Sequence, residues 1–349
     1  MKNSYSMTAS SIADTSADAR RWVPILARYR EPSTSRSLFE VAITLAAFVL
    51  LWALGWWALS ISPWLAGGIA VLNAFILVRL FVIQHDCGHG ALFSSRRLAD
   101  WTGRALGVLT VTPYDVWRRI HAEHHGHSGN LDRRGMGEVQ TLTAAEYRAL
   151  SPMGQLRYRI YRHPAFLFGF APAWVFLLEN RLPLGLMRAG RVYWISAMGT
   201  NVAVAALLGL IWYFGGLLPL LVLFLPTTVL AATIGVWLFY VQHQFEETHF
   251  EHEPEWQLHD AALHGSSHYD LPAPLHWLTA NIGLHHVHHL NSRIPFYRLP
   301  AVLRDHPELD RAGQRLTLRE SLHCVRLKLW DEERRKLVTL ADGLAPAAA

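Results

Sequence analysis

The chain has 349 residues, of which 51% are hydrophobic and only 17% charged, with a formal net charge of +5. Together with 14 Trp, this composition indicates a membrane protein rather than a soluble enzyme. The two cysteines, Cys87 and Cys324, lie far apart, which argues against a disulfide-stapled secreted domain.

The N-terminal region is rich in Ser, Thr, Ala and Arg, and leads into a stretch too apolar and too long for a signal-peptide core. We therefore expect residues 1–38 to form a flexible cytosolic tail. Residues 39–300 are expected to form a membrane domain with a cytosolic cap. Residues 301–349 should form a cytosolic C-terminal segment with a disordered Ala-Pro-Ala-Ala-Ala end.

Hydropathy predicts four membrane-spanning helices. The 21 residues 41–61 carry no charge, and about 20 apolar residues cross a bilayer core. The next apolar stretch carries one charge, Arg79, whereas residues 192–245 carry none over 54 positions. The latter stretch is long enough for two helices joined at Gly215-Gly216. The predicted spans cover about 40–61, 63–83, 192–214 and 217–241.

The basic residues predict the orientation of these spans. Of 32 Lys and Arg, six precede the first span, fourteen lie between residues 84 and 191, and eleven follow residue 241. The positive-inside rule therefore places both termini and the long middle segment in the cytosol. Arg79 is expected to snorkel to the cytosolic face.

A shorter apolar stretch, residues 164–178, has 15 residues and cannot span a bilayer. We expect an interfacial or re-entrant helix, with a buried core helix as the alternative. The neighbouring Arg157, Arg159, Arg162 and Arg181 suit anionic headgroups.

Three histidine boxes follow the patterns HxxxH, HxxHH and HxxHH. They are His85-Asp86-Cys87-Gly88-His89, His121-Ala122-Glu123-His124-His125 and His285-His286-Val287-His288-His289. Residues three or four apart share a helix face, so each box can direct its imidazoles to one place. The predicted topology brings all three boxes to the cytosolic side. Eight imidazoles exceed the four ligands of a closed zinc site and predict a binuclear centre, although imidazole alone does not select the metal.

These motifs resemble those of membrane fatty acid desaturases, specifically the bacterial acyl-lipid type similar to Δ12 (ω-6) desaturases. The resemblance covers about residues 40–300 and also includes residues 240–247, 265–270 and 281–284. It implies an all-α integral membrane protein with four transmembrane helices and a cytosolic helical cap that holds a histidine-rich di-metal site. It further implies an oxidoreductase in which two iron ions activate O2, which leaves as water, and a double bond forms in an acyl chain.

By this resemblance nine histidines bind the two iron ions. They are His85, His89, His121, His124, His125, His243, His285, His288 and His289. His243 is the expected ninth ligand because it lies where the fourth span reaches the cytosol; a hydrogen bond to a carboxylate is its alternative role. His268 stands where the family more often has Tyr, and is expected at most to contact a ligand. His127 and His286 lie off the pattern.

Other side chains are expected to support the site. A ligating His usually donates its second N–H to a carboxylate or carbonyl. Candidate carboxylates are Asp86, Glu123, Asp132, Glu246 and Glu247. Candidate tunnel-lining residues, with ordinary helix packing as the alternative, are Phe75, Trp237 and Phe239. Five further histidines are expected to be structural or exposed: His249, His252, His259, His264 and His276.

The expected partners are a membrane lipid or acyl substrate, the bilayer and an external electron donor, with no nucleic acid. Neither a His-Pro-Gly-Gly haem motif nor a Rossmann glycine fingerprint occurs, so a separate, ferredoxin-like donor is expected. Four arginines near the second box can steer an acidic donor or bind headgroups. They are Arg118, Arg119, Arg133 and Arg134.

Two alternative functions would also use clustered histidines. A related di-iron hydroxylase or ketolase acting on alkanes, fatty acids or carotenoids would share the metal site. A metal transporter is disfavoured because residues 41–83 and 192–242 contain no His, Asp or Glu.

Overall fold

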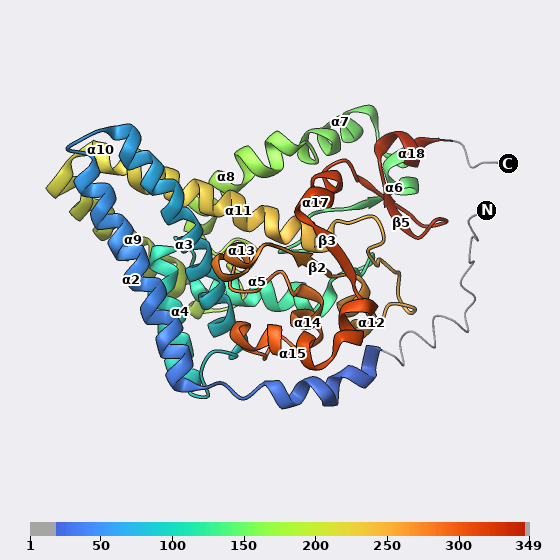
Figure 1. The fold of residues 1–349 in the computed structure, drawn as a ribbon. Coiled ribbons are helices and arrows are strands. Elements are labelled where there is room, and N and C mark those ends of the chain that lie inside the picture. Colours follow the sequence, from blue (N-terminus) through green and yellow to red (C-terminus); the bar gives the residue numbers. More distant parts are fainter. Residues whose placement is uncertain (1–18, 346–349) are drawn as a thin grey trace.

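A computed structural model describes residues 19–345. Four of its helices are long and apolar enough to cross a membrane, as predicted. They are α2 (Thr34–Ala58), α3 (Pro63–His89), α9 (Arg191–Gly215) and the run Leu217–His243, which consists of α10 (Leu217–Pro219), the π-helix η4 (Leu220–Phe224) and α11 (Leu225–His243). Figure 1 shows these helices together at one end of the molecule.

Local sequence signals account for the ends of the spans. The Ser33 side chain caps α2, and Ser62 followed by Pro63 begins α3. Gly216 has φ +68° and ends α9 at the predicted turn. Gly90, also with φ +68°, ends α3 directly after the first box, so α3 extends six residues beyond the predicted boundary at residue 83.

The segments between α3 and α9 and after α11 gather at one end of the four spans, and we call this region the cap (Figure 1). Between α3 and α9 lie α4 (Arg96–Leu109), α5 (Tyr114–His127), β1 (Leu142–Thr143), α6 (Ala144–Ala149), α7 (Pro152–Tyr161), the π-helix η2 (Ala165–Phe170), α8 (Ala171–Leu177) and η3 (Glu179–Arg181). After α11 come α12 (Leu258–His264), β2 (Ser267–Asp270), α13 (Ala273–Leu278), α14 (His285–Leu290), η5 (Phe296–Arg298), α15 (Leu299–Asp305), α16 (Pro307–Ala312), β3 (Gln314–Thr317), α17 (Leu318–Cys324), β4 (Leu329–Asp331), β5 (Lys336–Val338) and α18 (Leu340–Leu344).

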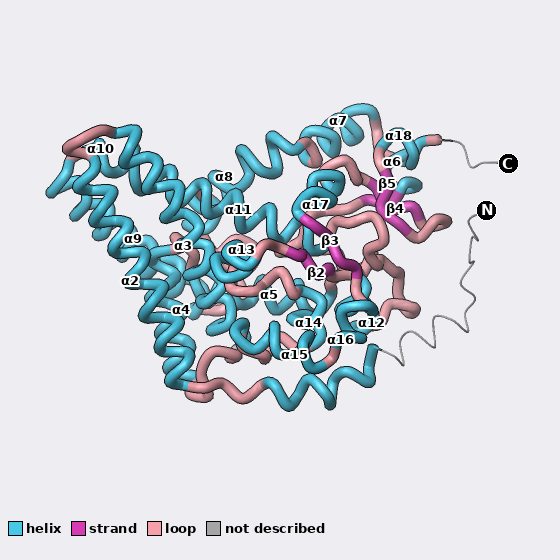
Figure 2. The backbone as a smooth tube through the Cα atoms, in the orientation of Figure 1, coloured by secondary structure: helices cyan, strands magenta, loops and turns pink. Residues whose placement is uncertain are grey.

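The cap contains two small sheets beside its helices, which the sequence did not predict (Figure 2). Strand β2 pairs in parallel with β3, with Ser267 opposite Gln314. In the other sheet β4 pairs in parallel with β1 and antiparallel with β5. The C-terminal segment therefore supplies strands to both sheets, and its described residues are an integral part of the cap.

The prediction of a flexible tail over residues 1–38 is wrong for residues 19–38. Residues 19–26 are helical and continue into η1 (Ala27–Tyr29), while α2 already begins at Thr34. Trp22 is 1% exposed and packs edge-on against His306, and the Tyr29 hydroxyl donates a hydrogen bond to Asp305. Residues 1–18 and the end of the chain, residues 346–349, lie outside the described residues.

Arg79 does not snorkel. Its side chain is 2% exposed and forms an ion pair with Glu40 of α2 at 2.5 Å. It also donates to the Thr44 hydroxyl and to the Trp277 carbonyl. A carboxylate partner and hydrogen bonds offset the desolvation of a buried charge, so this arginine joins two spans to α13.

The apolar stretch 164–178 forms η2 and α8. One side of it is buried at Leu167 and Pro172, whereas Phe170, Trp174 and Leu178 on the other side are 54%, 47% and 56% exposed. This one-sided burial does not fit the alternative of a buried core helix. Placement of the exposed side in the membrane interface stays a prediction.

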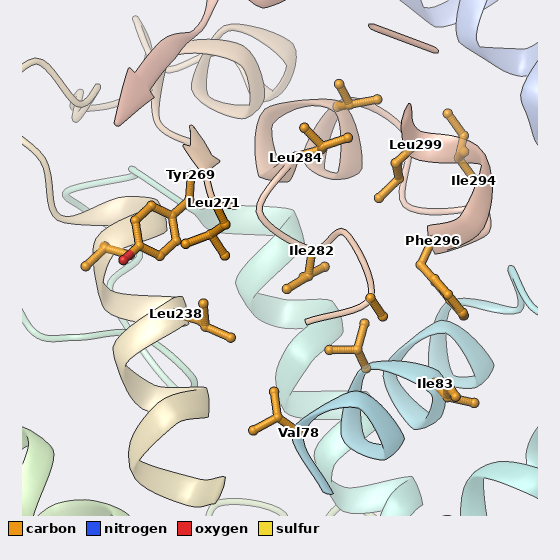
Figure 3. Close-up of a cluster of buried hydrophobic side chains, with 14 of the residues drawn as sticks. Val78, Ile83, Leu238, Tyr269, Leu271, Ile282, Leu284, Ile294, Phe296 and Leu299 are labelled. Atoms are coloured by element: carbon orange, nitrogen blue, oxygen red, sulfur yellow. The ribbon is translucent and has the colours of Figure 1, made fainter. Parts of the chain in front are cut away.

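The largest hydrophobic core lies where the spans meet the cap. Figure 3 shows Val78 and Ile83 of α3 and Leu238 of α11 beside apolar residues from the segment that carries the third histidine box. Those cap residues include Tyr269, Leu271, Ile282, Leu284, Ile294, Phe296 and Leu299. Burial of these side chains fixes the third box against the ends of α3 and α11.

Arg162 is buried at 0% exposure and does not face headgroups, contrary to expectation. Its guanidinium donates to the Gln140 carbonyl and the Thr141 hydroxyl, both at 3.1 Å. It also donates to the Gln244 side chain at 2.8 Å and to the Leu327 carbonyl at 3.1 Å. One side chain thus joins the loop before β1, the end of α11 and the C-terminal segment.

We expect Arg162→Ala to destabilise the protein by about 3 kcal/mol or more, because each buried acceptor left without a donor costs about 1–3 kcal/mol. Thermal unfolding of the purified protein in detergent measures this effect. Arg157→Ala, at an exposed position of α7, is the matched control and should leave the melting temperature unchanged. Equal melting temperatures for the two variants would show that Arg162 has no such role.

Candidate metal centre

Local structure positions the histidine boxes. The first box occupies the last turn of α3, the second the last turns of α5, and the third begins α14. Non-glycine residues with positive φ, Ala280 at 48° and Asn281 at 55°, form the tight turn that precedes the third box. The i, i+3 and i+4 spacings therefore lie on helices, as the sequence predicted.

All nine histidines predicted as ligands come together, in two groups of ring nitrogens. One group contains His85, His89, His121, His125 and His288. The other contains His124, His243, His285 and His289. We call the nine together the histidine cluster. His243 joins it from the end of α11, so its predicted place is supported by the geometry.

The candidate ligand atoms in each group lie within 4.8 Å of one another, and several pairs are much closer. The Nε2–Nε2 distances are 3.2 Å for His85–His89, 3.1 Å for His121–His125, 3.1 Å for His125–His288, 3.2 Å for His124–His243 and 3.0 Å for His243–His285. Imidazoles that bind one metal ion at ~2.1 Å place their nitrogens ~3.0–3.4 Å apart. The donor set therefore fits a metal ion in each group.

Burial keeps the cap histidines neutral. Desolvation lowers the pKa of His124 to about 3. Desolvation and repulsion from neighbouring imidazoles lower the pKa of five others well below the usual range: His121, His125, His285, His288 and His289. Near neutral pH these rings carry a lone pair rather than a second proton, which is the form that binds a metal. Nε2 of His289 is buried without a hydrogen-bond partner among the described residues, as expected of a ligand atom.

Outer hydrogen bonds orient two of the rings. His85 Nδ1 donates to Asp86 at 3.1 Å, and the second oxygen of Asp86 accepts the Phe296 N–H at 2.7 Å. His243 Nδ1 donates to the Gly265 carbonyl at 3.0 Å. Each bond leaves Nε2 free for the centre of the cluster. Asp86 is the one candidate carboxylate of the sequence that contacts the cluster in this way.

The other candidate carboxylates have different partners. Glu123 pairs with Arg119 and lies 3.5 Å from His127. Asp132 pairs with His252 at 2.7 Å. Glu246 and Glu247 lie just after α11. Glu246 pairs with Lys336, and no contact with a cluster histidine is described for Glu247.

Glu138 is a supporting residue that the sequence did not reveal. Its carboxylate lies 3.4 Å from His124 Nδ1, and burial raises the pKa of Glu138 to about 8. Ionisation of this carboxyl is favoured by positive charge on a metal-bound His124. The residue sits in a loop without periodicity, where Gly137 has φ +84°, so only the folded chain brings it to the second box.

The histidines expected to lie off the pattern remain outside the cluster. His286 is buried on the opposite side of α14, with its ring 5.9 Å from that of His268. His268, Asp270 and His276 form a third group of possible ligands. Protein partners already occupy it, because His268 hydrogen-bonds Asp310, Asp270 pairs with Arg315 and His276 accepts the Leu271 N–H.

Comparison with known proteins agrees with this picture. The family model described as fatty acid desaturase matches residues 62–320. A fatty acid desaturase of Bacillus subtilis is 40% identical over 315 residues, which is 90% of this chain and 88% of the relative. An sn-1 oleoyl-lipid 12-desaturase of Anabaena variabilis is 26% identical over 72% of this chain and 71% of its own length. An sn-1 acyl-lipid omega-3 desaturase (ferredoxin) of Synechocystis is 28% identical over 77% and 74%, respectively.

Four membrane-length helices and a buried histidine cluster above them define an α-helical membrane protein with a candidate metal centre. Because the family model and the Bacillus subtilis relative both match most of its length, the chain belongs to the fatty acid desaturase family.

We expect Glu138→Ala to weaken metal binding about 10–100-fold, because the partners of metal-bound histidines contribute about this much to affinity. Glu138→Gln, which keeps an acceptor but loses the charge, should have a smaller effect. Elemental analysis of purified protein after equilibration with graded chelator measures the affinity. Glu123→Gln is the control, and an effect as large as that of Glu138→Ala would contradict the assigned role of Glu138.

Proposed function

We propose that the protein is a membrane-bound, O2-dependent di-iron desaturase that introduces a double bond into an acyl chain of a membrane lipid. The main support is the division of nine histidines into groups of five and four, each with the spacing of metal ligands. Membership of the fatty acid desaturase family adds to it. The proposed ligands are the nine histidines of the cluster.

In the proposed reaction the acyl chain loses two hydrogen atoms from adjacent carbons. These, together with two electrons and two protons from outside, reduce O2 to two waters. Two bound iron ions would supply the power to oxidise an unactivated C–H bond, which no amino-acid side chain has. The chain itself contributes the neutral imidazoles, their orientation and a largely buried environment.

The position of the double bond is proposed to be of the Δ12 (ω-6) type. Relatives named 12-desaturases are 24–26% identical to this chain, and the 40% identical relative is named without a position. These names support an acyl-lipid substrate in this chain and make the double-bond position a quantity to measure.

The electron donor is proposed to be a separate ferredoxin-like protein, in line with the name of the Synechocystis relative. The four arginines near the second box should attract an acidic electron donor less strongly than the sequence suggested. Each of them is paired with a carboxylate: Arg118 with Asp100, Arg119 with Glu123, Arg133 with Glu253 and Arg134 with Glu146. Paired charges produce a smaller field than free ones.

The distribution of basic residues supports an orientation with both termini and the histidine cluster on the cytosolic side of a bacterial inner membrane. In that orientation the donor reaches the cap from the cytosol, and the substrate reaches it from the bilayer.

We expect cells that express the protein to accumulate a new unsaturated acyl species in their lipids. His124→Ala removes a ring of α5 that contacts His243 at the end of α11. It should abolish that species and lower bound iron. Mass spectrometry with double-bond localisation, together with iron analysis, measures both. His163→Ala, at an exposed histidine, is the matched control and should behave as the wild type. A hydroxylated or ketone product in place of the alkene would exclude desaturation.

A further inference from the structure

Three aromatic residues adjoin the histidine cluster with the same spacing on three different helices. They are Phe81, four residues before His85 on α3; Trp117, four before His121 on α5; and Phe239, four before His243 on α11. Residues four apart share a helix face, so each aromatic residue precedes a cluster histidine by one helical turn on the same face. We call these three residues the aromatic layer.

Two rings of the aromatic layer, Trp117 and Phe239, contact cluster histidines, and Phe81 contacts Trp117. The Trp117 ring stacks on His121 with centroids 4.6 Å apart, and Phe81 meets Trp117 edge-on at 5.5 Å. Phe239 meets His124 edge-on at 4.9 Å. A Cβ at Gly88 would lie 2.9 Å from the Trp117 ring, so a side chain at this position of the first box would clash with the indole. The layer therefore borders both groups of histidines.

The aromatic layer is not sealed inside the core. All three rings are half-buried, although the chain neighbours Leu80, Val116 and Leu238 are buried. A single partly exposed Trp is common even in a core, but here three aromatic rings from three helices are all partly exposed beside one buried cluster. Their remaining exposure indicates an apolar surface that leads up to the cluster.

Helix α8 lies at the outer edge of this surface. Its Phe176 ring contacts Phe81 edge-on with centroids 6.1 Å apart. The exposed side of the same segment carries Phe170, Trp174 and Leu178, which face away from the protein. In a membrane protein an exposed apolar helix face contacts lipid, so Phe176 stands between the lipid and the aromatic layer.

Open space continues along α11. Gly235 lies four residues before Phe239 on the same face and is half-buried, and a Cβ added there would meet nothing within 4 Å. Open space alone is not unusual in the spans, since Gly199 and Gly209 also meet nothing within 4 Å, but those two glycines lie on the exposed side of α9, whereas Gly235 shares a face with Phe239 and His243. At 1.5 Å rise per residue, Gly235 is about 12 Å along the helix from His243. The space at Gly235 thus extends the apolar surface away from the cluster.

We propose that the acyl chain enters from the bilayer past Phe176 of α8 and lies along the aromatic layer toward Gly235. The absence of a side chain at Gly235 then leaves room for the carbons beyond the reacting pair. The inference rests on the proposed function for the identity of its ligand, an extended methylene chain. We call this proposed path for the acyl chain the slot. Phe176 lies at its mouth, and Gly235 controls the length of the chain that it accepts.

The test compares the full-length wild type with Gly235→Leu in host membranes that contain acyl chains of several lengths. We expect desaturation of the longest chains to fall about tenfold or more relative to the shortest, since small steric changes in an apolar site discriminate by 10–200-fold. Iron content should not change. Gly209→Leu is the matched control, because its added Cβ also meets nothing within 4 Å but lies on the exposed side of α9, and its product profile should equal that of the wild type.

A second measurement does not depend on catalysis. A membrane lipid whose acyl chain bears a photoreactive diazirine should label α8 and α11 near Phe176 and residues 235–239, and Gly235→Leu should remove the label near residue 235. Labelling there without any double bond in wild-type lipids would overturn the proposed function but support the slot. Double bonds with an unchanged chain-length profile in Gly235→Leu, or with labels only on other helices, would overturn the slot. Phe176→Ala should widen the mouth and admit branched chains, with exposed Phe170→Ala as its control.

Discussion

The packing of nine imidazoles in two groups, with ring nitrogens within 4.8 Å of one another and several pairs only 3.0–3.2 Å apart, is the constraint on which the rest of the structure depends. Such a cluster is acceptable only when the rings are neutral, since protonated rings at this spacing would repel one another. Desolvation of the cap histidines keeps the protons off. Lone pairs that face one another are stabilised in turn by a cation between them. The fold therefore both creates the burial and leaves the space that a metal ion requires.

Long-range hydrogen bonds hold the first and third boxes and His243 at that spacing. Asp86 accepts the Phe296 N–H, and the Gln242 side chain donates to the Ile282 carbonyl at 3.0 Å. Together with the bond from His243 to Gly265, they tie the ends of α3 and α11 to the segment that carries the third box. Because the cluster tolerates little displacement, these buried polar bonds position the ligands as well as stabilising the fold.

Sequence predicts the parts of this protein that depend on local spacing. The four spans follow from uninterrupted hydropathy, and the shared helix face of the histidines within each box follows from their spacing. The ligand set came from the resemblance to desaturases, with His243 chosen as the ninth ligand for its place at the end of a span. Contacts between distant segments leave no such signal. Glu138 meets His124 through an irregular loop, Arg79 finds Glu40 on the neighbouring helix, and Ser267 pairs with Gln314 in a parallel sheet. Residues 19–38 look flexible by composition, yet Trp22 anchors them to a surface formed far along the chain.

The charge balance of the cluster sets it apart from carboxylate-rich metal sites. All nine converging groups are imidazoles, which would bring no negative charge to a bound metal cation. The carboxylates that approach, Asp86 and Glu138, stand behind the rings at their outer nitrogens. They offset positive charge through the imidazoles rather than by direct ligation. On the side of the aromatic layer the neighbours of the cluster are the apolar rings of Trp117 and Phe239, which would not neutralise a bound cation. In the proposed function, an apolar chain beside such a centre would offer no competing ligand and would leave the open metal positions to O2.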